Sequence, residues 1–106
     1  MIHENIETDS FKEKVDEGRH ELLDVRRPDE FYSGHIEGAV NIDFYEPGFQ
    51  EELGKLDREK SYLVYCRSGN RSEQTMSMMK HLGFKEVYNL AHGIIDWDDE
   101  GYDIVN

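Results

Sequence analysis

The sequence predicts a single α/β domain built around a mainly parallel sheet. Short apolar runs alternate along the chain with segments of helical spacing, and crossover connections of this kind place helices on both faces of a sheet. The 106 residues, of which 37% are hydrophobic, are enough to bury one core. We therefore expect residues 1–106 to form one domain.

The first half of the chain predicts three helices and two strands. Residues 8–18 carry an apolar pair at helical spacing and end in glycine, which indicates a short amphipathic helix. Residues 21–25 form an apolar run, and Pro28 is placed to begin another short helix. A second strand is expected at 39–42 and a third helix at 47–56.

The second half contains the run that best fits a central strand, residues 61–65, which leads directly into the only cysteine. A helix is expected to begin near Ser72 and to end at Gly83, and residues 86–90 then return as a strand. One helical face should carry Ser72, Thr75, Met78, Met79 and Leu82. A last segment at 93–100 follows, with Trp97 among its anchors.

Charge and hydropathy restrict the classes of partner. The formal net charge of -12 opposes the phosphates of nucleic acid and anionic membrane surfaces, and no basic patch is evident. The amino terminus resembles no secretory signal, and no apolar run is long enough to cross a bilayer. We expect a cytoplasmic protein with neither nucleic acid nor membrane as a partner.

The cysteine count restricts the chemistry. With Cys66 alone, no internal disulfide and no multi-cysteine zinc site can form, and the histidines show no metal-ligand spacing. No metal and no cofactor are expected. Any covalent state of Cys66 must be resolved by a second molecule.

The segment Cys66, Arg67, Ser68, Gly69, Asn70, Arg71 and Ser72 predicts an anion-binding active site. A strand that ends at the cysteine and a helix that begins soon after leave a turn whose backbone amides converge on one point. Gly69 and Asn70 tolerate left-handed backbone, which would curl the loop. The amides, the helix dipole, Arg67 and Arg71 all favour a Cys66 thiolate, which is a nucleophile.

These motifs together resemble the single-domain rhodaneses, the thiosulfate sulfurtransferases. The matching stretches, in chain order, are residues 22–26, Pro28 with Glu30 and Phe31, residues 34–39, Asn41 with Ile42, the loop 66–72, Gly83 with Phe84, residues 87–90, and Gly93 with Trp97. The resemblance covers nearly the whole chain. It implies a rhodanese-like fold, with about five strands flanked by helices on both faces.

The resemblance implies a sulfur transfer in two steps. Cys66 would take the outer sulfur of thiosulfate, or of another persulfide or polysulfide donor, and pass it to cyanide or a thiol. The loop amides would bind the persulfide, while Arg67 and Arg71 would attract the departing sulfite. A thioredoxin-like or sulfur-carrier protein is a further partner that such chemistry allows.

Three residues outside the loop are candidates for supporting roles. Asp24 and Arg26 follow a strand on the side of the active site, where an ion pair that braces the loop is the first expectation. His92 stands where the family usually has the first of two glycines, so it could influence acceptor choice. His35 is expected to cap a turn.

Two other functional classes stay open. A non-catalytic binding or regulatory module could retain the same fold. A cysteine-dependent phosphatase or arsenate reductase also uses a thiolate in an amide cradle, but it needs arginine after five intervening residues, where this chain has Ser72. The arginine comes one position early, at Arg71, which favours the sulfurtransferase.

Overall fold

The computed structural model describes all 106 residues and contains one five-stranded sheet in the order β1-β5-β4-β2-β3. Every neighbouring pair of strands is parallel. The strands are β1 (Ile2–Ile6), β2 (Glu21–Asp24), β3 (Val40–Asn41), β4 (Ser61–Tyr65) and β5 (Glu86–Leu90). The predicted fold class is confirmed, with β4 in the centre of the sheet and buried along its whole length.

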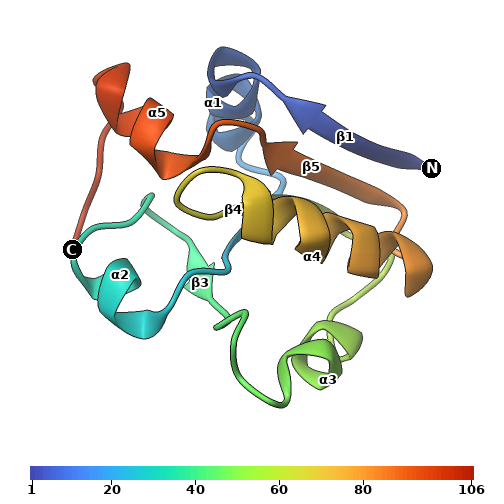
Figure 1. The fold of residues 1–106 in the computed structure, drawn as a ribbon. Helices are drawn as coiled ribbons and strands as arrows, with labels where there is room; N and C mark the ends of the chain where they lie inside the picture. The colour runs from blue at the N-terminus through green and yellow to red at the C-terminus, as the bar shows by residue number, and fades with distance from the viewer.

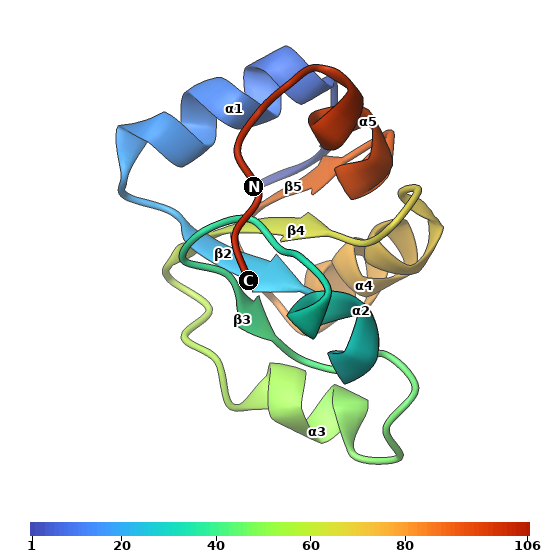
Figure 2. The same ribbon diagram turned by 90° about the vertical axis from the view of Figure 1, so that its left-hand side faces the viewer.

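Five helices cover the sheet on both faces (Figure 1). They are α1 (Thr8–Glu17), α2 (Pro28–Tyr32), α3 (Phe49–Gly54), α4 (Asn70–His81) and α5 (Gly93–Asp99). Figure 2 shows α1 and α5 on one side of the sheet and α3 on the other. None of these helices is long and apolar enough to cross a membrane.

Alternation along the strands divides the interior into two cores. In β4, Leu63 and Tyr65 pack with Phe11 of α1 and Trp97 of α5, while Val64 belongs to the opposite core. That opposite core includes Phe49 and Leu53 of α3, and Met76 and Met79 of α4. Successive side chains of a strand point to opposite faces, so one apolar run supplies both cores.

All the strands point the same way, so their carboxyl ends share one edge of the sheet (Figure 2). Cys66 follows β4 at this edge, and α2 lies beside it. Loops at the carboxyl ends of parallel strands are the usual site of ligand binding in open α/β sheets. The fold thus places the predicted active-site loop where such sheets bind their ligands.

Several boundaries differ from the sequence-based expectation. The helix expected at 47–56 is α3, which is shorter, and the helix expected near Ser72 begins at Asn70. Met76 is buried on α4, whereas the predicted Met78 is only partly buried. Strand β1 has no counterpart in the sequence-based elements, because its exposed polar residues hide the pattern of a strand.

Candidate active site

Cys66 lies directly after β4, and its side chain is enclosed by the start of α4. The residue is only 1% exposed. Its Sγ accepts hydrogen bonds from the backbone N–H of Gly69, at 3.1 Å, and from the Ser72 hydroxyl, at 3.3 Å. Two donors aimed at one sulfur stabilise negative charge on it.

The loop ends in the amino terminus of α4, a helix of 12 residues. The Glu73 N–H is bonded to the Gly69 carbonyl at 3.0 Å, as in any first helical turn. The amides of Asn70, Arg71 and Ser72 precede that bond, so they have no acceptor within the helix. These free amides and the helix dipole give the start of α4 a positive potential, and the binding of an anion by the loop stays a prediction.

Two glycines let the loop meet the turn between β5 and α5. Gly69 has φ +101°, and a Cβ there would lie 2.1 Å from the Ala91 carbonyl oxygen. Gly93 has φ +74°, and its Cβ would lie 2.0 Å from the Arg67 carbonyl oxygen. The left-handed backbone expected at Gly69 is confirmed. The same expectation for Asn70 is wrong, because Asn70 is the first residue of α4 and no residue other than glycine has positive φ.

Arg71 is held in a partly buried ion pair. Its Nη1 and Nη2 donate to the two carboxylate oxygens of Glu30 at 2.8 and 3.0 Å. This pairing lowers the pKa of Glu30 to about 2 and raises that of Arg71. Arg71 was expected to attract sulfite, but its charge is already balanced by the carboxylate of Glu30 on α2.

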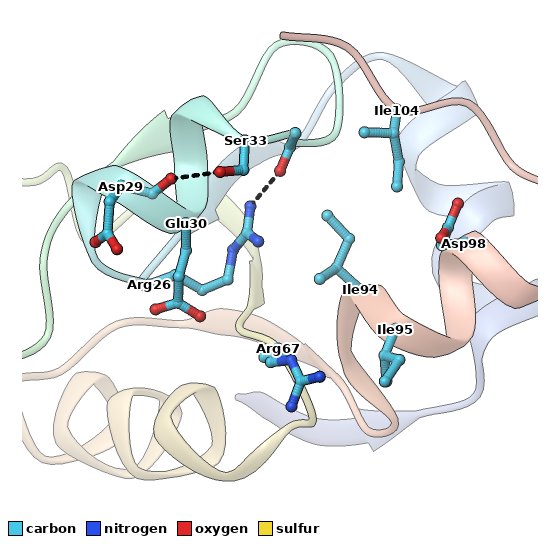
Figure 3. Close-up of a pocket in the computed structure, with 10 residues that line it drawn as sticks. Arg26, Asp29, Glu30, Ser33, Arg67, Ile94, Ile95, Asp98 and Ile104 are labelled. Atoms are coloured by element: carbon cyan, nitrogen blue, oxygen red, sulfur yellow. Dashed lines mark hydrogen bonds between the residues drawn. The ribbon is translucent and has the colours of Figure 1, made fainter.

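Arg67 is exposed and lines a cavity of about 350 Å³ between α2 and α5. Figure 3 shows Asp29, Glu30 and Ser33 on one side of this cavity, with Ile94, Ile95 and Asp98 of α5 on the other. The first turn of α5 also binds the loop, because the Ile94 N–H donates to the Cys66 carbonyl at 2.9 Å. The cavity therefore adjoins the cysteine loop at Arg67.

Asp24 and Arg26 form the buried ion pair that the sequence favoured. Arg26 Nη2 lies 2.7 Å from Asp24 Oδ2 and also donates to the Gly34 carbonyl at 2.6 Å (Figure 3). Burial lowers the pKa of Arg26, but the hydrogen bonds and charge of Asp24 outweigh it and raise that pKa overall. The pair braces the segment after β2 that forms the floor of the cavity.

The two histidines of the site region have different surroundings. His35 Nδ1 hydrogen-bonds the Phe31 carbonyl at 3.0 Å and its ring stacks on Phe31, so it caps the end of α2 as expected. His92 is 52% exposed and pairs with Glu7 at 3.0 Å. The close approach is made by Gly93, so a side chain at position 92 fits without displacing the loop. An effect of His92 on acceptor choice stays a prediction.

Two contacts of the site were not predicted from the sequence. Glu30 pairs with Arg71 across 41 residues, and Asn89 of β5 donates to the Gly69 carbonyl at 3.2 Å. Both residues belong to stretches that carried the family resemblance, but neither stretch indicates which distant residue its side chain contacts. The molecule contains no group of three or more histidine, cysteine or acidic residues arranged to hold a metal ion.

Comparison with known proteins agrees with the fold. The family model of the rhodanese-like domain matches residues 7–100. A rhodanese-related protein from Thermoplasma volcanium has the same fold, with a TM-score of 0.85 and 31% identity over 96% of this chain and 97% of that one. The human single-domain sulfurtransferase TSTD1 shares the fold at 22% identity, with a TM-score of 0.77 over 91% and 96% of the two chains.

Two curated relatives are longer proteins. The putative sulfur carrier protein YrkF of Bacillus subtilis is 37% identical over 87% of this chain but only 49% of its own length. The tRNA uridine(34) hydroxylase of Yersinia pestis is 31% identical over 87% of this chain and 27% of its own. This chain thus spans half or less of these relatives. The family match over residues 7–100 and the cysteine loop at the carboxyl edge of the sheet lead to one conclusion, that the chain belongs to the rhodanese-like domain family.

Proposed function

We propose that the protein is a sulfurtransferase that carries sulfane sulfur as a persulfide on Cys66. The observation that supports this most directly is the position of Sγ between the Gly69 N–H and the Ser72 hydroxyl, at the amino terminus of α4. These donors stabilise a thiolate before the reaction and a persulfide anion after the first step.

In the first step, the Cys66 thiolate attacks the outer sulfur of thiosulfate. The bond between the two sulfurs of the donor breaks, sulfite leaves with the electron pair, and Cys66 becomes a persulfide. In the second step, a thiolate or cyanide attacks the terminal sulfur, and Cys66 leaves as the thiolate that began the cycle. No resolving cysteine is needed within the chain, which has only one.

Arg67 is the residue best placed to guide an anionic donor. It lines the cavity beside the loop, and no ion pair neutralises it, whereas Arg71 is bound to Glu30. We assign Arg67 to attraction of the sulfite group, and Arg71 to holding the loop against α2. A polysulfide or the persulfide of a small thiol is an alternative donor, because the two donors at Sγ, Gly69 N–H and the Ser72 hydroxyl, face the transferred sulfur and not the rest of the donor molecule.

The acceptor side of the reaction is open to proteins as well as small thiols. The relative YrkF is a putative sulfur carrier, and the cavity beside Cys66 opens at the surface between two helices. A sulfur-carrier or thioredoxin-like protein that presents a thiol there is a candidate acceptor. Such a partner would take the terminal sulfur by the same displacement as a small thiol.

The arrangement favours sulfur transfer over phosphate hydrolysis. A phosphatase loop grips its oxyanion with an arginine that is free to contact it. Here the Arg71 guanidinium is bound to Glu30. Ser72, which stands at the position of the phosphatase arginine, donates to the Cys66 sulfur. A non-catalytic module would not need two hydrogen-bond donors to Cys66 Sγ. Loading of sulfur onto Cys66 distinguishes such a module from an enzyme.

The test is to expose the protein to thiosulfate and to measure its mass. We expect a gain of one sulfur that maps to Cys66, that is absent from Cys66→Ala, and that is lost when cyanide or a thiol is added. Polysulfide and glutathione persulfide serve as further donors. Failure to load from any of them, with the thiol still reactive towards iodoacetamide, would leave the binding module as the better explanation.

A further inference from the structure

We infer that Asn89 is a positioning residue for the cysteine loop and acts through Gly69 and Ser72. Asn89 lies on β5, the strand next to β4 (Figure 1), and its side chain hydrogen-bonds Asn5 and the Gly69 carbonyl, not Cys66. The inference deepens the proposed function, since it explains how the two hydrogen bonds to Sγ are maintained. It concerns thiol reactivity, which can be measured whether or not sulfur is transferred.

The orientation of the Asn89 side chain is fixed by its donors. Nδ2 donates one hydrogen to the Asn5 side-chain oxygen at 2.8 Å and the other to the Gly69 carbonyl at 3.2 Å. The opposite orientation of the amide is excluded, because its oxygen would then face these two acceptors and has no hydrogen to donate. Asn5 is itself held by Glu73 of α4, because its Nδ2 donates to that carboxylate at 2.8 Å.

The Asn89 oxygen has no hydrogen-bond partner, although the residue is only 1% exposed. An unpaired buried acceptor costs free energy, and an apolar residue at this position of a buried strand would avoid that cost. The amide is therefore difficult to explain by stability alone. A buried polar atom without a partner calls for an explanation, and a role in a functional site is one.

The contact between Asn89 and the Gly69 carbonyl determines which acceptor the Ser72 hydroxyl uses. The Ser72 hydroxyl has one hydrogen but two acceptors within reach, Cys66 Sγ at 3.3 Å and the Gly69 carbonyl at 3.2 Å. That carbonyl already accepts from the Glu73 N–H and from Asn89. With both of its lone pairs engaged, the carbonyl does not need the Ser72 hydrogen, which is then free for the sulfur.

Asn89 thus acts on the nucleophile through the Gly69 carbonyl. By occupying that acceptor, its amide leaves the Ser72 hydroxyl free to donate to Sγ. Without the amide, Ser72 would turn to the Gly69 carbonyl and the thiolate would lose a donor. The rate of any reaction that begins with the thiolate would fall.

The test measures alkylation of Cys66 by iodoacetamide at pH 7 in Asn89→Leu, Ser72→Ala and the double variant. We expect Asn89→Leu to slow alkylation about tenfold, and to slow it less than twofold when Ser72→Ala is already present. Asn89→Ala, which cannot clash, repeats the measurement if the leucine variant does not fold. Tyr62→Phe is the control, because it removes a side-chain bond to a backbone carbonyl, that of Asp57, before β4.

Thermal unfolding of each variant separates positioning from stability. We expect the melting temperature of Asn89→Leu to be unchanged or raised, because the unpaired oxygen is gone. The inference would be overturned if Asn89→Leu slowed alkylation equally with and without Ser72→Ala, or did not slow it in either case. A lower melting temperature together with faster alkylation would also overturn it, since Asn89 would then be holding the structure closed. If thiosulfate fails to load Cys66 while alkylation shows the expected coupling, only the proposed function fails.

Discussion

Arg67 and Arg71 have the same side chain but different surroundings. Arg71 is 17% exposed and its two terminal nitrogens match the two oxygens of Glu30. Arg67 is exposed at the wall of the cavity and has no ion pair. Their positions in the loop do not distinguish them, because the partner of Arg71 is supplied by α2, which is distant in sequence.

We predict that Glu30→Gln lowers the free energy of unfolding by about 1 to 2 kcal/mol at pH 7. This is the range for a bidentate, half-buried ion pair after solvent screening. The pKa of Glu30 is lowered from 4.5 to about 2 by Arg71. A carboxyl with a lowered pKa stabilises the fold above its unfolded pKa and loses that effect as the pH falls. The difference between wild type and variant should therefore shrink between pH 5 and pH 2.

Urea unfolding at a series of pH values checks this expectation. Glu52→Gln is the matched control, since Glu52 also forms an ion pair, with Lys55 at 3.0 Å, but both side chains are more than half exposed. We expect no more than a few tenths of a kcal/mol there. A Glu30→Gln effect that stays constant down to pH 2 would show that packing, not the charge, accounts for it.

At the scale of elements, the loop is shaped by the turn between β5 and α5. Gly93 brings this turn against Arg67, and the first amides of α5 then bind the carbonyls of Cys66 and Arg67 at 2.9 and 3.2 Å. The helix α5 therefore holds the cysteine loop from one side while α4 provides its amides from the other. The geometry around Sγ depends on both helices.

We predict that Gly93→Ala costs more stability than its backbone angle alone explains. A left-handed conformation costs an alanine roughly 1–2 kcal/mol, and the Cβ would also lie 2.0 Å from a backbone oxygen that cannot move freely. Gly83→Ala is the control, because its φ is +92° but nothing lies within 4 Å of the new atom. Urea unfolding should place Gly93→Ala below Gly83→Ala by about 2 kcal/mol or more, a size typical of steric overpacking. Equal losses would mean that the loop yields to the extra atom.

The elements that the sequence predicted well are those whose pattern is local. Strand β4 is rich in aromatic and aliphatic residues, and Gly83 directly follows the C-cap of α4, so both features could be predicted from neighbouring residues. Strand β1 could not, because it lies at an edge of the sheet and pairs with β5, which is about 80 residues away. The contacts of Glu30 and Asn89 were missed for the same reason. A hydrogen bond between distant segments leaves no periodic signal in either of them.

The charge of the whole molecule opposes the reaction proposed for its loop. The chain has 24 acidic and 12 basic residues, and thiosulfate is a dianion. Since Arg71 is neutralised by Glu30, the local attraction comes from Arg67 and the amides of the loop. The balance between local attraction and overall repulsion depends on the range of the electric field.

The range of the electric field becomes shorter as salt is added. The molecule measures 34 × 28 × 21 Å. At 10 mM salt the screening length is roughly 30 Å, so carboxylates all over the surface repel an approaching anion, whereas at 0.15 M it is roughly 8 Å and the loop dominates. Alkylation of Cys66 by anionic iodoacetate should therefore accelerate about twofold between these concentrations of NaCl, and loading from thiosulfate somewhat more, before both decline at higher salt. Neutral iodoacetamide, which meets the same thiolate without a charge of its own, should react at a constant rate and thus exclude a change in the loop itself. If the rates of both anionic reactions fell steadily from the lowest salt onward, the attraction by Arg67 and the loop amides would outweigh the repulsion by distant carboxylates at every salt concentration.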